Sequence, residues 1–265
     1  MLRITGEHPD LITIMDNNRD RQKQFWEEAG RIGYDTAMFK NKTVEKHIMA
    51  KHRQAALDTA AALGLRKDWH VLELGCGDGR FAGGILAQFV EHIDAFDVSA
   101  NAIERAQADV RTGNVVYAVK DITLHDYLPH ERWDAAFLMG FLHHVKNAAP
   151  EIIARLALVC PRVIVVEPNG NNLLRKGLEL LPSYRRAGED SFRLEELLRL
   201  FSAHGYDAQV TRRITLLPPF LPEILFRPAA RLEHLFEHNT FLSNACSTLV
   251  MGFSHRSLLT EQHRA

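Results

Sequence analysis

Length, composition and charge set the first limits on what this chain can be. It has 265 residues, of which 46% are hydrophobic, and this is enough for one large domain with its own core. Its 32 Lys and Arg residues against 33 Asp and Glu residues give a formal net charge of -1, which argues against a dedicated nucleic-acid-binding protein, because such proteins usually carry a basic stripe.

The first 42 residues predict little regular structure apart from one short helix. Residues 1–19 are polar and uneven, whereas residues 20–29 show an amphipathic pattern that contains Phe25 and Trp26. We expect residues 1–42 to form an N-terminal helical lid on the domain that follows.

A second, longer helix is predicted over residues 43–63. Apolar side chains recur there on one face at helical spacing. Thr43 is the expected N-cap, and Gly64 is placed to end the helix in a left-handed conformation, with Leu65 closing back on it. This helix opens the domain that we expect to span residues 43–256, before a tail at 257–265.

From residue 69 onward, short apolar runs alternate with helical patterns. Strands are predicted at 69–74, 92–98, 114–119, 134–140 and 162–167, and helices at 80–90, 100–110 and 149–160. Such alternation predicts crossover units and a parallel sheet with helices on both faces. The strands are apolar on both sides, which fits burial on both faces.

The alternation breaks after Glu167. Two insertions are expected, at about 168–191 and at 214–243. The elements predicted in this part are a helix at 192–204, a strand at 207–216, a helix near 228–237 and a last strand at 245–256. The domain is therefore expected to add two strands that are each reached by a long connection.

The stretch with the most chemical information is VLELGCGDGRF, residues 71–81. Gly75, Gly77 and Gly79 join a predicted strand to a helical segment, where unpaired backbone N–H groups can hold a ligand and glycine lets it approach closely. Asp97 ends the next strand, eighteen positions after Gly79, where an acidic side chain can bind both hydroxyls of a ribose. This combination predicts an adenosine-bearing cofactor.

A dinucleotide cofactor is the first alternative, because GDGRFA, read from Gly77, satisfies the dinucleotide-binding pattern. Three features weigh against it. Glu73 precedes the turn inside the strand, where a carboxylate suits a cationic amine better than a pyrophosphate. Asp121 follows the third strand, where it can accept a hydrogen bond from an adenine amino group. The chain then ends in a long excursion and not in three further crossover units.

Taken in order, these segments resemble the class I S-adenosylmethionine (SAM)-dependent methyltransferases, and most of all their small-molecule, type 11-like branch. The resemblance covers about residues 43–256. It rests on five segments. VLELGCGDG matches the family's first motif, FDVS matches the acidic end of its second strand, and KDI matches its adenine-contacting motif. FLMGFLHHV matches the motif after the fourth strand, and STLVMGF resembles the antiparallel seventh strand. It implies an α/β, Rossmann-like fold with a seven-stranded, mostly parallel sheet and an antiparallel last strand.

The resemblance also implies roles for individual residues toward SAM and its product S-adenosylhomocysteine (SAH). Glu73 would reach the methionine ammonium, directly or through water, and Asp97 would bind the ribose. The remaining expected contacts are Gly75, Cys76 and Gly77 at the turn, Val98, Asp121 and Ile122 around the adenine, and Met139 and Gly140 near the sulfonium. The helix at 43–63 matches the helix that caps this cofactor site.

His143 and His144 follow the fourth strand and are the candidate catalytic residues. Methyl transfer is an in-line displacement, and a base helps only where a hydroxyl acceptor must lose its proton. Both histidines could instead be structural: His144 aligns with the more widespread family position, and His143 is the preferred substrate contact. No metal is expected, because adjacent histidines should point apart and no carboxylate cluster accompanies them.

Two regions are expected to select the methyl acceptor. One is the lid, with the aromatic residues Phe25, Trp26, Tyr34 and Phe39. The other is the connection after the fifth strand, where Glu167 and Asn169 should face the crevice. The basic cluster there, with Tyr184 beside it, consists of Arg175, Lys176, Arg185 and Arg186. It suggests an acidic acceptor, or else is a solvated helix face. The apolar insertion could cover a hydrophobic acceptor or form a homodimer contact.

The sequence therefore predicts methyl transfer from SAM to a small molecule, with oxygen as the expected acceptor atom and a natural product, lipid or sugar-type metabolite as substrate. The alternatives are an NAD(P)-dependent oxidoreductase and a non-catalytic partner subunit. Nucleic acid is not expected, because no Asn/Asp-Pro-Pro-Tyr motif follows the fourth strand. The cysteines are scattered and form no C-x-x-C motif, and the first residues show no apolar leader segment. Both features predict a cytoplasmic protein. The apolar run ITLLPPFLPEILF is too short and broken to cross a bilayer.

Overall fold

Seven strands form one continuous sheet in the order β3-β2-β1-β4-β5-β7-β6. This computed structural model describes residues 23–28, 31, 41–109, 112–124, 132–181, 189–218 and 221–257. The strands are β1 (His70–Leu74), β2 (His92–Asp97), β3 (Val115–Val119), β4 (Ala135–Met139), β5 (Arg162–Pro168), β6 (Tyr206–Ile214) and β7 (Thr248–His255). Strands β1 to β5 pair in parallel, and β7 runs antiparallel to both β5 and β6. The predicted fold class is confirmed.

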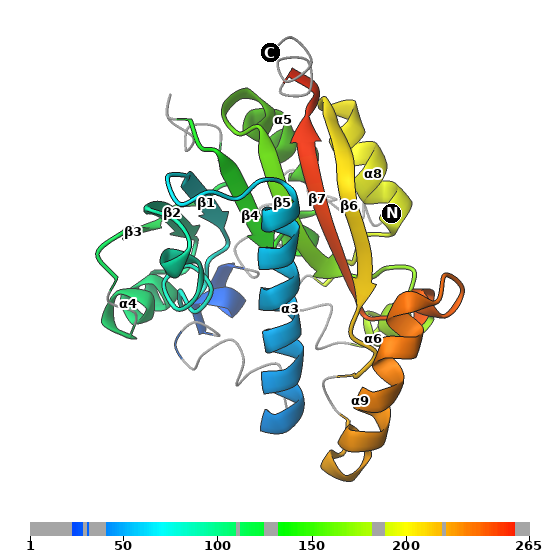
Figure 1. The fold of residues 1–265 in the computed structure, drawn as a ribbon. Coiled ribbons are helices and arrows are strands. Elements are labelled where there is room, and N and C mark those ends of the chain that lie inside the picture. Colours follow the sequence, from blue (N-terminus) through cyan, green and yellow to red (C-terminus); the bar gives the residue numbers. More distant parts are fainter. Residues whose placement is uncertain are drawn as a thin grey trace, which may run out of the picture.

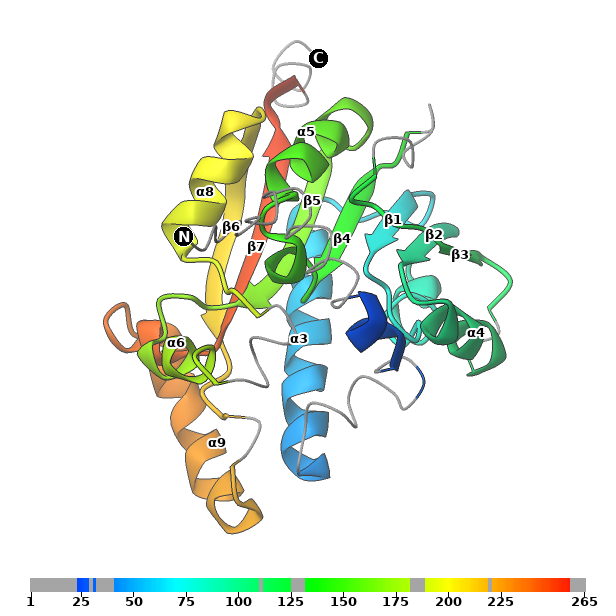
Figure 2. The same ribbon diagram turned by 180° about the vertical axis from the view of Figure 1, so that it is seen from behind.

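Helices cover both faces of this sheet (Figures 1 and 2). Besides a short helical stretch at residues 23–28, the helices are α3 (Lys42–Ala62), α4 (Ala100–Asp109), α5 (Ala149–Val159), α6 (Leu173–Leu178), α8 (Leu194–Ala203) and α9 (Glu223–His238), and the short 3₁₀ helices are η1 (Leu86–Gln88), η2 (Leu142–Val145) and η3 (Leu242–Ala245). Helix α3 lies on one face, and α5 and α8 lie on the other. No helix in these ranges combines the length and the apolarity needed to cross a membrane.

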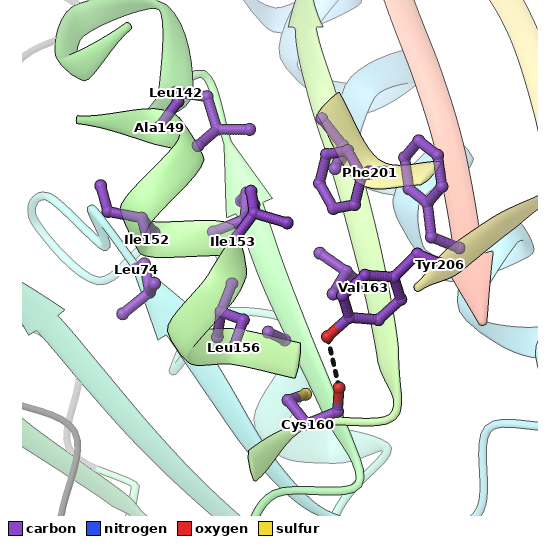
Figure 3. Close-up of a cluster of buried hydrophobic side chains, with 14 of the residues drawn as sticks. Leu74, Leu142, Ala149, Ile152, Ile153, Leu156, Cys160, Val163, Phe201 and Tyr206 are labelled. Carbon is purple, nitrogen blue, oxygen red and sulfur yellow. Dashed lines mark hydrogen bonds between the residues drawn. The ribbon is translucent and has the colours of Figure 1, made fainter. Parts of the chain in front are cut away.

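Side chains alternate along the strands and feed two separate cores. On β1, Leu72 and Leu74 belong to the core beneath α5 and α8, whereas Val71 belongs to the core beneath α3. Figure 3 shows the first of these cores, in which the Tyr206 hydroxyl donates to the Cys160 carbonyl oxygen at 2.5 Å. Burial on both faces explains why the strands read as continuous apolar runs.

Helix α3 begins and ends through its capping residues. The prediction of Thr43 as N-cap is wrong: Asn41 holds that position, and its side chain accepts from the Thr43 and Val44 N–H groups. Gly64 does adopt a left-handed conformation, with φ +86°. The Leu65 N–H returns to the Ala60 carbonyl oxygen at 2.9 Å, so the predicted helix end is confirmed.

The predicted helix at 80–90 is wrong. That segment forms irregular turns and the short η1 turn, although Phe81, Leu86 and Val90 are still buried. The Leu86 N–H reaches back five residues to the Phe81 carbonyl oxygen at 2.8 Å, which is wider than an α-helical turn. Gly83 and Gly84 explain the difference, because two adjacent glycines have a low preference for the helical state.

Helix α9 begins five residues earlier than the predicted position near 228. Pro228 lies inside it on the exposed side, so that the backbone carbonyl left without a helical partner faces water. The helix packs beside α3 at the end of the molecule where both project beyond the sheet (Figure 1). Helix α9 therefore makes up most of the insertion expected at 214–243.

Candidate active site

The glycine turn after β1 is as tight as its sequence predicts. Gly75, Gly77 and Gly79 all have positive φ, at +72°, +54° and +74°. A Cβ atom on Gly75 would lie 2.5 Å from a ring carbon of Phe141, and one on Gly79 would lie 2.6 Å from the Tyr117 hydroxyl oxygen. Both the backbone angles and the neighbouring side chains therefore require glycine at this turn.

Asp97 connects this turn to the end of β2. Its Oδ2 accepts from the Gly77 N–H at 2.8 Å, and its Oδ1 accepts from the Ser99 N–H at 2.9 Å. The side chain is buried at the carboxyl end of the strand, and it holds the two adjacent loops in register. The carboxylate predicted to bind a ribose thus lies directly against the glycine turn.

Glu73 is a buried carboxyl group one residue before the end of β1. Its exposed fraction is 2%, and Oε2 has no hydrogen-bond partner among the residues that the structure describes. Burial, together with the nearby charge of Asp97, raises the pKa of Glu73 well above its usual value. A cationic group at Oε2 would satisfy this atom and stabilise the charged form, so the site fits the predicted methionine ammonium.

Cys76 lies inside the turn as a buried, neutral thiol. Its side chain packs with the core beneath α3, and burial raises the pKa of the thiol well above its usual value. A thiol in this state is a poor nucleophile. The geometry favours a packing role for Cys76, and its predicted contact with SAM stays a prediction.

The other predicted cofactor contacts follow the carboxyl ends of β2, β3 and β4. Asp121 accepts from the Thr123 N–H at 3.1 Å and from the Thr123 hydroxyl at 2.6 Å. Ile122 is buried in the core beneath α5. Val98 and Met139 are half-buried, and Gly140 is exposed with φ +65°. All five residues lie along the edge that carries Glu73 and Asp97, and their contacts with SAM stay predictions.

Glu167 was predicted as an acceptor contact, and in the structure it holds the loop after β4. Its carboxylate accepts from the Phe141 N–H at 2.8 Å and from the Leu142 N–H at 2.7 Å. Its Oε2 also lies 2.6 Å from Nδ1 of His143. These bonds fix η2 and the candidate catalytic histidines to the end of β5.

His143 is buried between two carboxylates. Nδ1 faces Glu167, and Nε2 lies 3.2 Å from Oε2 of Glu189. Burial by itself lowers the pKa of His143, but the charge of Glu167 and hydrogen bonds to both carboxylates outweigh it, so the pKa is raised. An imidazolium with both nitrogens engaged cannot accept a proton, so this arrangement favours a positioning role for His143. The general-base role stays a prediction.

The basic cluster of the connection after β5 is neutralised where the structure describes it. Arg175 pairs with Glu189 and Glu179, and Lys176 pairs with Glu179 at 2.7 Å and with Asp190 at 3.3 Å. These contacts favour ion pairing within the loop over binding of an acidic acceptor. Arg185, Arg186 and Tyr184 lie outside the described residues, as do Tyr34 and Phe39 of the lid.

Asn169 holds the loop that follows β5. Its side chain donates to the Cys246 carbonyl oxygen at 2.8 Å and accepts from the Asn171 N–H at 3.0 Å. It is fully buried. Its predicted contact with the acceptor therefore stays a prediction, and its visible contacts join α6 to the loop before β7.

The expectation that the adjacent histidines point apart is wrong. The ring centroids of His143 and His144 are 3.7 Å apart, and a nitrogen of each ring lies within 4.8 Å of a Glu189 oxygen. His70, His92 and Asp94 form a similar group at the opposite end of the sheet. A metal ion bound at Nε2 of His143 would have to displace the proton that this nitrogen shares with Glu189, and the prediction of no metal stays a prediction.

Part of the predicted lid reaches this edge of the sheet. Residues 23–28 are helical, and Trp26 packs against the His144 ring with centroids 4.3 Å apart. The Asn101 N–H, at the start of α4, donates to the Glu27 carboxylate at 3.3 Å. This short helix therefore bridges the loop after β4 and the segment after β2, on either side of the glycine turn.

Known proteins share this fold. Residues 71–161 match a family described as a methyltransferase domain. Magnesium protoporphyrin IX methyltransferase from Synechocystis PCC 6803, solved with bound SAH, has a TM-score of 0.61 and 17% identity, over 89% of this chain and 99% of that chain. A chain of the Haloferax volcanii complex between the Trm112 methyltransferase activator and a methyltransferase has a TM-score of 0.60 and 16% identity, over 87% of this chain and 97% of that chain.

A third similar structure, the [4+2]-cyclase SpnF, has a TM-score of 0.54 and 16% identity, over 77% of this chain and 80% of that chain. No curated protein sequence is similar enough to this chain to count as a match. At these identities the structural likeness shows the fold. The predicted fold is confirmed: the chain has the fold of the class I SAM-dependent methyltransferases, with a methyltransferase domain matched over residues 71–161. The neighbours solved with SAM or SAH agree with SAM as the cofactor.

Proposed function

We propose that this chain transfers the methyl group of SAM to a hydroxyl oxygen of a small-molecule acceptor. The observation that carries the proposal is Glu73. Its buried Oε2 has no hydrogen-bond partner in the described part of the chain, and it lies one residue before the β1 end that leads into the glycine turn. A dinucleotide would bring a pyrophosphate to this turn, and a buried carboxylate would repel it.

The residues at this edge have separate tasks in the proposed reaction. When bound, SAM supplies an electrophilic methyl group on a sulfonium. Glu73 would hold the ammonium, and Asp97 the ribose hydroxyls, so that the methyl group is fixed in one direction. Trp26 and the lid would exclude water, and the ion network around His143 would keep the loop after β4 in place. Alignment of acceptor and methyl group then supplies most of the rate.

Asp97→Ala tests the cofactor half of this proposal. It removes a charged acceptor from the ribose, and each such hydrogen bond is worth roughly 1.5–3 kcal/mol. SAH affinity measured by calorimetry should fall at least about tenfold. Asp58→Ala, which removes a half-exposed carboxylate on α3, is the matched control and should leave affinity unchanged. Unchanged affinity in Asp97→Ala would refute the ribose assignment.

The acceptor half needs a screen for turnover. The chain is incubated with SAM that carries a labelled methyl group and with pools of phenols, sugars, hydroxy acids and lipid-like alcohols, and label transfer to a product is measured. We expect transfer to a hydroxyl oxygen in one pool. Transfer to nitrogen or carbon would overturn the choice of atom. SAH binding without transfer to any acceptor would favour the alternative of a non-catalytic partner subunit.

A further inference from the structure

Helix α9 presents an apolar stripe to solvent. Ile224, Pro228, Leu232 and Leu235 recur every three or four residues and therefore share one face of the helix. The Ile224 side chain is 85% exposed and that of Leu232 is 51% exposed. A surface helix of a globular protein normally turns such a stripe toward the core, so its outward direction needs an explanation.

The inward face of α9 is held by polar contacts. The buried Glu233 carboxylate lies 2.6 Å from Nε2 of His47 and 3.0 Å from Nζ of Lys51, both on α3. It also accepts from the Leu216 N–H, just after β6, at 2.8 Å. Because Glu233 lies on the side of the helix opposite the stripe, these bonds fix the leucines outward.

Neighbouring elements extend the apolar surface. Phe241, just before η3, is 87% exposed, and exposed leucines of α6, Leu173 among them, lie beyond it. The Asn172 side chain donates to the Ala245 carbonyl oxygen at 2.7 Å, which joins α6 to η3. Both views of the fold show α6 and α9 at the same end of the molecule (Figures 1 and 2). We call this surface the apolar tip. It consists of the exposed side chains of Leu173 and Leu174 on α6, of Ile224, Leu225, Leu232 and Leu235 on α9, and of Phe241 and Leu242 at η3.

Basic side chains flank the apolar tip. Arg227 and Arg231 are exposed, lie one turn apart along the stripe, and make no ion pair with any other residue that the structure describes. His234 and His238 follow on the same flank, with stacked rings 4.1 Å apart. Apolar side chains bordered by arginine suit the boundary between the headgroups and the acyl chains of an anionic lipid layer.

We propose that the apolar tip docks this protein on an anionic lipid surface. The shape of this end of the molecule favours a lipid layer over a second copy of the chain as the binding partner. Helices α9 and α3 project beyond the sheet (Figure 1), and a projecting end can enter a deformable lipid layer. A two-fold dimer through this face would also bring the arginines of both copies to one interface. Helix α6 follows β5, so the tip lies at the edge that carries Glu73 and Asp97. On the proposed function, docking would bring an apolar acceptor from the lipid layer to the methyl donor.

The test is co-sedimentation of the full chain with lipid vesicles. One set contains phosphatidylcholine alone, and the other also contains roughly 30% phosphatidylglycerol, which gives an anionic surface. The wild-type chain should sediment with the anionic vesicles, and about 0.5 M salt should release most of it. Leu232→Glu with Leu235→Glu should lower the bound fraction at least about tenfold, because two leucines would no longer be buried in lipid. Arg227→Glu with Arg231→Glu should abolish the preference for anionic lipid.

Leu158→Glu is the matched control, because Leu158 is an exposed leucine on α5, away from the tip. It should bind vesicles as the wild type does. The same samples are checked by SAH calorimetry and light scattering. Failure to sediment with intact SAH binding overturns the docking proposal and leaves the proposed function standing. A wild-type dimer that the Leu232→Glu, Leu235→Glu variant converts to a monomer shows that a second copy covers the tip, and this also overturns the proposal.

Discussion

Glu167→Ala should lower the free energy of unfolding by about 3–5 kcal/mol, as expected when one partner of a buried ion pair is removed. The substitution leaves the His143 imidazolium without its nearer carboxylate, and it leaves the Phe141 and Leu142 N–H groups without an acceptor. Urea denaturation at neutral pH measures the change. Glu167 connects the end of β5 to the loop after β4 through Phe141, Leu142 and His143. We therefore expect its removal to have the largest effect on stability of any single polar side chain.

Two comparisons show whether charge in this network causes the effect. Glu104→Ala, which removes an exposed carboxylate on α4, should stay within about 0.5 kcal/mol of the wild type. The pKa of His143 is raised to about 9, so its stabilising contribution is complete below the unfolded value of about 6.5 and is lost as the pH rises through 9. Glu167→Gln should reduce this loss. A Glu167→Ala variant as stable as the wild type would contradict the network.

Glu73→Gln should have opposite effects on stability and on cofactor binding. The pKa of Glu73 is raised by burial and by Asp97, so its ionisation above the unfolded pKa costs stability in the protein without SAM. Glutamine does not ionise, and the variant should therefore melt at a higher temperature than the wild type at neutral pH. Its SAH affinity should fall about tenfold to a hundredfold, because the ammonium of SAH loses its hydrogen bond to a charged carboxylate.

The pH dependence separates this explanation from a simple packing change. The stability gained by Glu73→Gln should shrink as the pH falls below about 4, where the wild-type carboxyl is neutral in both the folded and the unfolded state. Glu104→Gln should change neither the melting temperature nor SAH affinity. A Glu73→Gln variant that binds SAH as tightly as the wild type would remove Glu73 from the cofactor site.

The positions of the glycine turn and of the strand-end carboxylates were predictable because their signals are local. Three glycines at alternate positions, and carboxylates that end consecutive strands, have a meaning once the strands are assigned. Glu73 shows the limit of this reading. Its place before the turn was visible, whereas its unpartnered oxygen and its raised pKa depend on burial beneath α3 and on Asp97, which only the folded chain brings near.

The acceptor half was harder to predict because its contacts join distant segments. His143 lies 24 residues from Glu167 in sequence, and Glu189 comes from a separate loop. Their position after the fourth strand made His143 and His144 candidate bases, but the two carboxylates that hold His143 charged had no local signal. Helix α9 is a second case. The apolar character of the insertion was visible in the sequence, but Glu233, which fixes the direction of the stripe on α9, needs partners on α3 and after β6.

One titration tests the central claim most directly. The purified chain is titrated in a calorimeter with SAH, and separately with NAD⁺ and NADP⁺, under the same conditions. We predict saturable binding of SAH at one site per chain, and no binding of either dinucleotide at the same concentrations. Tight binding of NAD⁺ or NADP⁺ without binding of SAH would contradict the assignment of Glu73, Asp97 and the glycine turn to a methyl donor.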